Sequence, residues 1–122
     1  MTRNWTIIRA ILLRLEAAST PNTVLNAKDL APFEEQEVAY NIRLLSEAGY
    51  IKANTLESKS GDGRIAAALA RSLTNSGHEL LDTIRSDTVW GKIQDKFKTS
   101  GVEMTFDLVI MAGKKIMENL LG

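Results

Sequence analysis

Few side chains in this sequence have the type and spacing that catalysis or metal binding requires. The chain has no cysteine, which excludes thiol nucleophiles, disulfides and iron–sulfur or zinc-finger sites. The one histidine, His78, has no second histidine with which to share a metal and no Gly-x-Ser-x-Gly nucleophile motif to assist. Asp82 and Arg85 have the spacing of a local ion pair on a helix. We therefore expect no enzyme, cofactor, metal ion or small-molecule substrate.

Basic side chains are the remaining candidates for a function, because they neutralise phosphate groups in nucleic-acid complexes. Residues 50–73 contain four of them against two acidic side chains: Lys52, Lys59, Arg64 and Arg71. Three more lie near the start of the chain: Arg3, Arg9 and Arg14. Residues 28–49 are acidic, with five acidic and two basic side chains. The formal net charge is zero, so any attraction for nucleic acid must come from a local patch.

The composition is that of an ordinary globular protein with a single core. Of the 122 residues, 44% are hydrophobic and 25% are charged. No apolar run approaches the roughly 20 residues of a membrane span, and the start of the chain lacks the apolar core of a signal peptide. We expect a cytoplasmic protein that makes no contact with a membrane.

Apolar residues at helical spacing predict two long helices in the first half of the chain. The first follows Asn4 as its N-cap and carries a stripe formed by Trp5, Ile8, Ile11, Leu12 and Leu15. A short extended piece is expected at Thr23–Leu25. The second helix is expected over residues 32–48, with an apolar stripe of Val38, Ile42 and Leu45. Gly49 is expected to be its C-terminal cap, in the left-handed backbone conformation.

A β-hairpin is expected to follow the second helix. Tyr50–Ala53 has the composition of a strand, and the polar, glycine-containing segment Ser58–Gly63 fits a hairpin tip. Ile65–Leu73 is ambiguous, because its alanines favour a helix whereas its position after the tip favours a returning strand. We expect the strand.

Three further helices are predicted in the last third of the chain. Ser76 and Glu79 form a capping box for the first, Asp87 is placed to cap the second, and Thr105 is placed to cap the third. The third is apolar on more than one side, which is unusual for a surface helix of a monomer. We expect it to mediate homodimer formation, with a different protein partner or burial within the chain as alternatives. Its apolar residues are Phe106, Leu108, Val109, Met111, Met117 and Leu120.

The resulting fold class is mostly α with a small β-hairpin. The element order predicts a winged helix-turn-helix-like core over residues 1–85 and a C-terminal helical extension over residues 86–122, in one compact domain.

Two resemblances support this assignment. The stretch Glu35–Ile51, which contains Glu-Ala-Gly-Tyr-Ile, resembles the recognition helix and first wing strand of winged-helix proteins. The segments Ile8–Leu13, Leu73–Thr74, Gly77–Arg85 and Asp87–Trp90 resemble an uncharacterised bacterial and phage family, domain of unknown function 2513. This second resemblance spans most of the chain. It implies a winged-helix-like fold and a bacterial or mobile-element setting, but no activity.

The winged-helix resemblance implies binding to double-stranded DNA, with the second helix in the major groove and the wing on the backbone or minor groove. We therefore expect a bacterial or phage transcriptional regulator. Its expected contact residues are Gln36, Tyr40, Arg43, Lys59 and Arg64.

The alternative is a protein-interaction module on the same scaffold, for instance a phage or mobile-element protein that binds a host factor. Zero net charge favours it, as do the acidic residues of the second helix: Glu34, Glu35, Glu37 and Glu47. The segment Ala27–Ala31 is also too short to form a full preceding helix of a helix-turn-helix motif.

Overall fold

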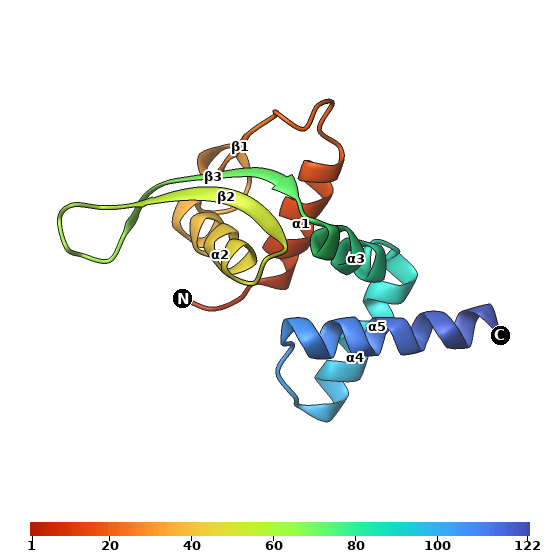
Figure 1. Ribbon diagram of the computed structural model, residues 1–122. Coiled ribbons are helices and arrows are strands. Elements are labelled where there is room, and N and C mark those ends of the chain that lie inside the picture. The colour runs from red at the N-terminus through yellow and green to blue at the C-terminus, as the bar shows by residue number, and fades with distance from the viewer. The chain divides into compact units, whose positions relative to one another are not determined.

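The computed structural model describes residues 1–122, with five α-helices and a three-stranded antiparallel sheet (Figure 1). The helices are α1 (Trp5–Glu16), α2 (Glu35–Glu47), α3 (Asn75–Ile84), α4 (Asp87–Ser100) and α5 (Phe106–Leu121). The strands are β1 (Leu25–Asn26), β2 (Ile51–Glu57) and β3 (Ile65–Leu73), and a short 3-10 helix, η1 (Ala27–Asp29), precedes α2. The chain divides into two compact units, Met1–His78 and Glu79–Gly122, with the boundary inside α3. The mostly α fold class with a small hairpin is confirmed.

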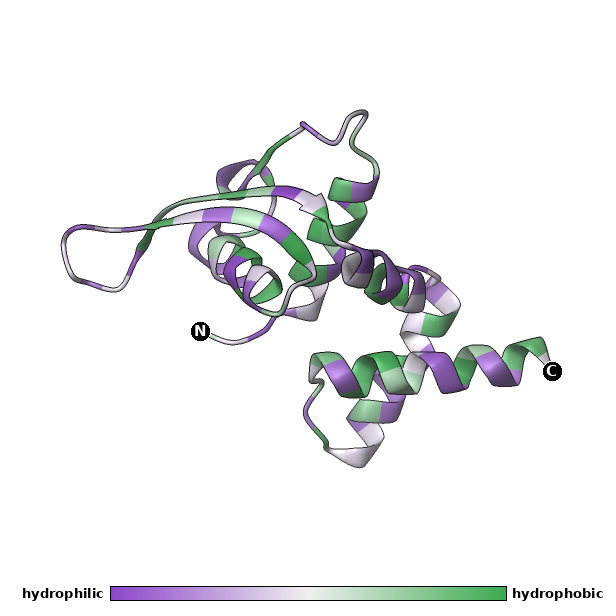
Figure 2. Cartoon of the chain, in the orientation of Figure 1, coloured by the Kyte–Doolittle hydropathy of each residue, from purple (hydrophilic) through white to green (hydrophobic).

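The first unit has the topology of a winged helix. Its elements run α1, β1, η1, α2, β2, β3, and β3 lies between β1 and β2 in the sheet. Helices α1 and α2 contact each other and β3, and Figure 2 shows hydrophobic residues recurring along both helices. The core is formed by apolar side chains with no exposed surface: Ile7, Ile8, Ile11, Leu12, Val38, Ile42 and Leu45.

Local signals set most of the helix ends in this unit. The side chain of Asn4 caps α1 and accepts hydrogen bonds from two backbone N–H groups, as predicted. Gly49 follows α2 with a φ of 84°, also as predicted. However, α2 begins at Glu35 and not at residue 32, because the side chain of Glu34 caps the helix by accepting from the backbone N–H of Glu37 at 3.0 Å.

The hairpin consists of β2 and β3, so the strand prediction for Ile65–Leu73 is confirmed. Its alanines fit a strand because Ala68 and Ala70 are buried small side chains beneath the two helices of the unit. β2 is longer than the predicted strand. Gly61 and Gly63 both have φ values above 70°, which the tip requires and which side chains disfavour.

Two of the three predicted caps in the last third of the chain are wrong. Thr74, and not Ser76, accepts from the backbone N–H three residues later at the start of α3. In the same way, Ser86 and not Asp87 caps α4. Thr105 caps α5 as predicted.

The second unit is built around the contact of α4 with α5. Ile93 and Val109 are fully buried, and Gly113 lies so close to Thr83 that an added Cβ would be 2.1 Å from the threonine Cγ2. Val109 is therefore part of the core of the chain, which removes it from the residues expected to mediate self-association. None of the helices is both long enough and apolar enough to cross a membrane.

Candidate nucleic-acid interface

The β2–β3 hairpin carries all four basic side chains of residues 50–73 on exposed positions. Lys59 and Arg64 lie on either side of the tip, and Lys52 and Arg71 lie near the other end of the hairpin. Arg71 occupies an irregularity in the strand register, and its guanidinium donates a hydrogen bond to the side-chain oxygen of Asn54. The hairpin thus concentrates cationic groups that are far apart in the sequence.

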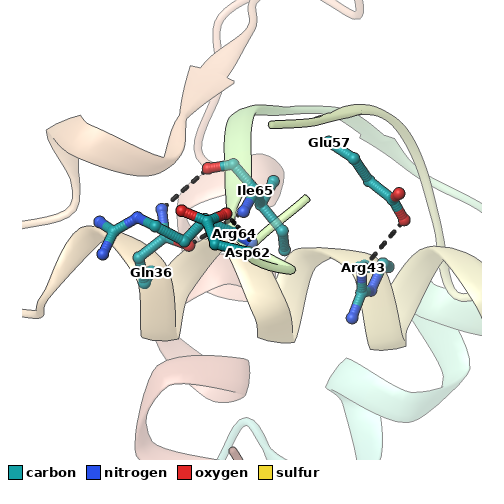
Figure 3. A network of polar contacts seen from close by, with 6 residues as sticks. All are labelled: Gln36, Arg43, Glu57, Asp62, Arg64 and Ile65. Carbon is teal, nitrogen blue, oxygen red and sulfur yellow. Dashed lines mark hydrogen bonds and ion pairs between the residues drawn. The ribbon is translucent and has the colours of Figure 1, made fainter. Parts of the chain in front are cut away.

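Gln36 fixes this hairpin to the first turn of α2. Its side-chain Nε2 donates to the backbone carbonyl of Ile65 at 2.8 Å, and its Oε1 accepts from the backbone N–H of Ile65 at 3.0 Å (Figure 3). The primary amide therefore pairs with β3 at Ile65 as the backbone of a neighbouring strand would. Ile65 is buried, and it begins the strand immediately after the tip. This arrangement makes Gln36 a positioning residue for the hairpin, a role that differs from the base contact expected from the sequence.

Asp62 lies at the tip between the two cationic residues. Its Oδ1 accepts a hydrogen bond from the backbone N–H of Arg64 at 2.9 Å. This bond, together with one from the Ser60 hydroxyl, lowers the pKa of the Asp62 carboxyl below its usual range. The carboxylate therefore stays ionised at neutral pH and offsets part of the positive charge contributed by Lys59 and Arg64.

Arg43 and Tyr40 lie together on α2. The Arg43 guanidinium carbon is 5.4 Å from the centroid of the Tyr40 ring, within the range of a cation–π contact. An Arg43 guanidinium nitrogen is 3.8 Å from a carboxylate oxygen of Glu57 on β2 (Figure 3). The side chain of Arg43 is 31% exposed, so its charge is partly accessible and partly offset by Glu57.

The first turn of α2 is acidic. Glu34, Glu35 and Glu37 are all exposed there. At the position where a helix-turn-helix motif has its first helix, immediately before α2, this chain has only the three residues of η1. Carboxylates at a helix N-terminus stabilise the helix through its dipole, by roughly 0.3–1 kcal/mol each. The same charges repel phosphate groups, so the helix end that would enter a major groove is electrostatically unsuited to it.

The other basic or titratable candidates contribute less. Arg3 and Arg9 on the N-terminal side are half-buried and already engaged in interactions within the chain, whereas Arg14 is exposed. His78 is exposed on α3. No group of three or more His, Asp or Glu side chains is arranged to hold a metal ion. Asp82 and Arg85 form the predicted ion pair, at 2.9 Å.

Comparison with known proteins gives one family and one relative. A family model described as "Hypothetical protein (DUF2513)" matches residues 2–103. An uncharacterised protein of Haemophilus influenzae is 36% identical over 122 residues, which covers the whole of both chains. No solved structure matches the chain.

Proposed function

We propose that this chain, which belongs to the DUF2513 family, binds double-stranded DNA through the β2–β3 hairpin of its first unit. The observation that carries the proposal is the set of four exposed cations on a hairpin that is held in place by Gln36. A wing on a winged-helix topology is an element that contacts the DNA backbone or minor groove. In this proposal the protein is a cytoplasmic bacterial or phage DNA-binding regulator.

The contact is made by the hairpin and not by the first turn of α2. The acidic side chains of that turn would face the phosphates if the helix entered the major groove end-on, and each such approach costs electrostatic free energy. The hairpin tip instead offers Lys59 and Arg64, which are exposed and have long side chains that extend towards phosphates. Tyr40 and Arg43, further along α2, are the remaining candidates for contact with a base edge.

Such binding depends mainly on phosphate neutralisation and therefore on salt. Four phosphate contacts give a slope of log K against log salt of about −3.6, which corresponds to a loss in affinity of about 150-fold between roughly 50 and 200 mM salt. The expected binding is therefore weak at physiological salt and readily measured at low salt. Replacing one contacting cation with alanine reduces the magnitude of the slope by about 0.9.

The test is fluorescence anisotropy of a labelled duplex of arbitrary sequence, titrated with the full chain at several salt concentrations. We expect Lys59→Ala and Arg64→Ala each to reduce the magnitude of the slope by about one unit. Lys98→Ala is the matched control, because Lys98 is an exposed lysine on α4 and its loss changes the net charge equally. A chain that does not bind duplex at low salt and tens of micromolar protein would refute the proposal, and so would an equal change of slope in the control.

A second candidate function is protein binding by the same scaffold. The exposed carboxylates of Glu34, Glu35 and Glu37 favour it, because they form an acidic surface on a first unit in which only the three-residue η1 stands immediately before α2. A basic partner segment would bind this surface. The discriminating experiment is an affinity capture from the native host with the wild-type chain and with Glu35→Lys as the paired bait. A host protein lost with the variant, in a chain that does not bind duplex, would favour this second function.

A further inference from the structure

The outward-facing side of α5 presents an exposed apolar side chain, Met111, with the partly exposed Leu108 beside it and charged side chains around them. Gly113 fixes the orientation of α5 in the second unit, because a Cβ there would be 3.2 Å from Ile93 Cδ1 on α4 and even closer to Thr83. Val109 and Ile116 are buried on the same side of the helix. Met111 is on the opposite side and is 64% exposed. Figure 2 shows that the first turns of α5 consist almost entirely of hydrophobic residues.

This surface continues into a groove beside α4. The groove has a volume of about 310 Å³, and its apolar lining comes from both helices and the loop between them: Phe97, Val102, Leu108, Met111 and Ala112. Val102 is 50% exposed, so the loop adds to the apolar area. Methionine and leucine side chains in such a groove adapt to the shape of a partner helix.

The charged residues within about one turn of Met111 have an arrangement that is complementary to itself. At about 100° per residue, Asp107 and Lys114 lie on the same side of Met111, one turn before it and about one turn after it. Both are exposed, and neither forms an ion pair within the chain. Leu108 and Lys115 lie on the other side of Met111. If two such helices pack antiparallel about a twofold axis at Met111, each Asp107 faces Lys114 of the other copy.

We propose that two copies of this chain pair antiparallel through the outer face of α5, with Met111 on the twofold axis. Asp107 of each copy forms an ion pair with Lys114 of the other. The aliphatic part of Lys115 covers Leu108 of the other copy, and its ammonium group remains in water. A twofold axis makes every such contact occur twice, so a single favourable pairing contributes double.

The size of this surface sets the expected affinity. A stable complex buries about 800 Å² on each partner. α5 has 16 residues, which makes it about 24 Å long and, with side chains, about 10–12 Å wide, so its outer face and the groove provide a smaller area than that. We therefore expect a reversible dimer that forms at concentrations of tens to hundreds of micromolar.

Sedimentation velocity of the full chain from about 10 to 500 µM tests the pairing. We expect the wild-type sedimentation coefficient to rise with concentration towards that of a dimer, and Met111→Glu to remain monomeric throughout. Asp107→Lys and Lys114→Asp should each weaken the dimer at least fivefold, because each places like charges opposite one another. Asp107→Lys combined with Lys114→Asp should restore it. Asp95→Lys, the same charge change at an exposed position on α4, is the control and should have no effect.

Two results would overturn the proposal. One is a wild-type chain that stays monomeric at 500 µM, in which case another protein or nothing covers this face. The other is a dimer that persists in Met111→Glu or that the double charge reversal fails to restore, because the pairing then uses another surface or register. Circular dichroism and thermal melting of each variant show whether the second unit remains folded. Asp107→Lys places a positive charge near the N-terminus of α5, which by itself weakens the helix. The double variant carries the same change, so a dimer that returns in it reports the charge pairing and not the stability of the helix.

Discussion

Replacing Gln36 with alanine tests the role of the link between α2 and the hairpin. The substitution removes both hydrogen bonds to Ile65, at 2.8 and 3.0 Å, and leaves a backbone N–H and a carbonyl without partners at a residue that is only 5% exposed. At roughly 0.5–1.5 kcal/mol net for each bond, the expected loss is about 1–3 kcal/mol. With a urea m value of about 1–3 kcal/mol/M, the unfolding midpoint of the first unit falls by about 1 M.

Two measurements on Gln36→Ala separate this positioning role from base recognition. Hydrogen exchange of the Ile65 amide reports the first unit directly, and it should become much faster than in the wild type. Duplex affinity should fall while the slope against salt stays unchanged, because the four cations of the hairpin remain. Gln94→Ala, the same truncation at an exposed position on α4, is the control. If Ile65 exchange and the midpoint match those of the control, the two hydrogen bonds do not hold the hairpin.

Three further predictions concern packing, helix propensity and titration. Gly113→Ala should destabilise the second unit by about 1–3 kcal/mol, because Thr83 is 2% exposed and its hydroxyl is bonded to the Glu79 carbonyl, so it cannot move away freely. Gly91→Ala, at a helical glycine with no atom near the added Cβ, should instead stabilise the protein by about 0.5–1 kcal/mol in a thermal melt. For Asp62, an NMR titration should give a carboxyl midpoint below that of an aspartate in an unstructured reference peptide. Since the pKa of Asp62 is lowered in the folded state, its contribution to stability is present above the unfolded-state pKa and is lost as the pH falls through the folded-state value. An Asp62 midpoint equal to that of the reference peptide would contradict the hydrogen bonds at the tip.

The elements that sequence reasoning identified correctly are those specified by local signals. Asn4 and Gly49 act within one turn of their own position, so their residue types alone predict the ends of α1 and α2. The hairpin tip likewise requires glycine at positive φ wherever it occurs. The family resemblance, also found from the residues, is confirmed by the match over residues 2–103.

Two of the predictions that failed, the cap of α3 and the role of Gln36, depended on contacts between distant parts of the chain. Thr74 begins α3 because it is anchored to the end of α2: its backbone N–H donates to the Tyr50 carbonyl at 3.0 Å and its hydroxyl donates to the Gly49 carbonyl at 2.6 Å. Ser76, two residues later, is an equally good cap by residue type, and nothing local distinguishes the two. Gln36 pairs with a residue 29 positions away, and no sequence signal reveals such a partner.

One long-range contact, that of Asn41 with the start of α1, could have been suspected from the sequence. Asn41 lies beside the apolar stripe of α2 and is 1% exposed. Its Oδ1 accepts from the backbone N–H of Asn4 at 2.9 Å, and its amide donates to the Glu37 carbonyl at 2.8 Å. A polar side chain next to a buried stripe indicates a hydrogen-bonded partner elsewhere. Here that partner is the cap residue of α1, so Asn41 joins the two helices that support the hairpin.

The acidic and basic side chains of the first unit differ in what they do for the fold. Glu34 caps α2, and the two glutamates that follow it in the first turn stabilise the helix dipole, so local helix stability accounts for all three carboxylates. Whatever their origin, they still exclude phosphates from that end of the helix. The cations have no such structural purpose at the hairpin tip, where Lys59 and Arg64 are exposed and contribute nothing to the core. In the proposed complex with DNA, the link made by Gln36 matters because it determines where the cations of the hairpin stand relative to α2.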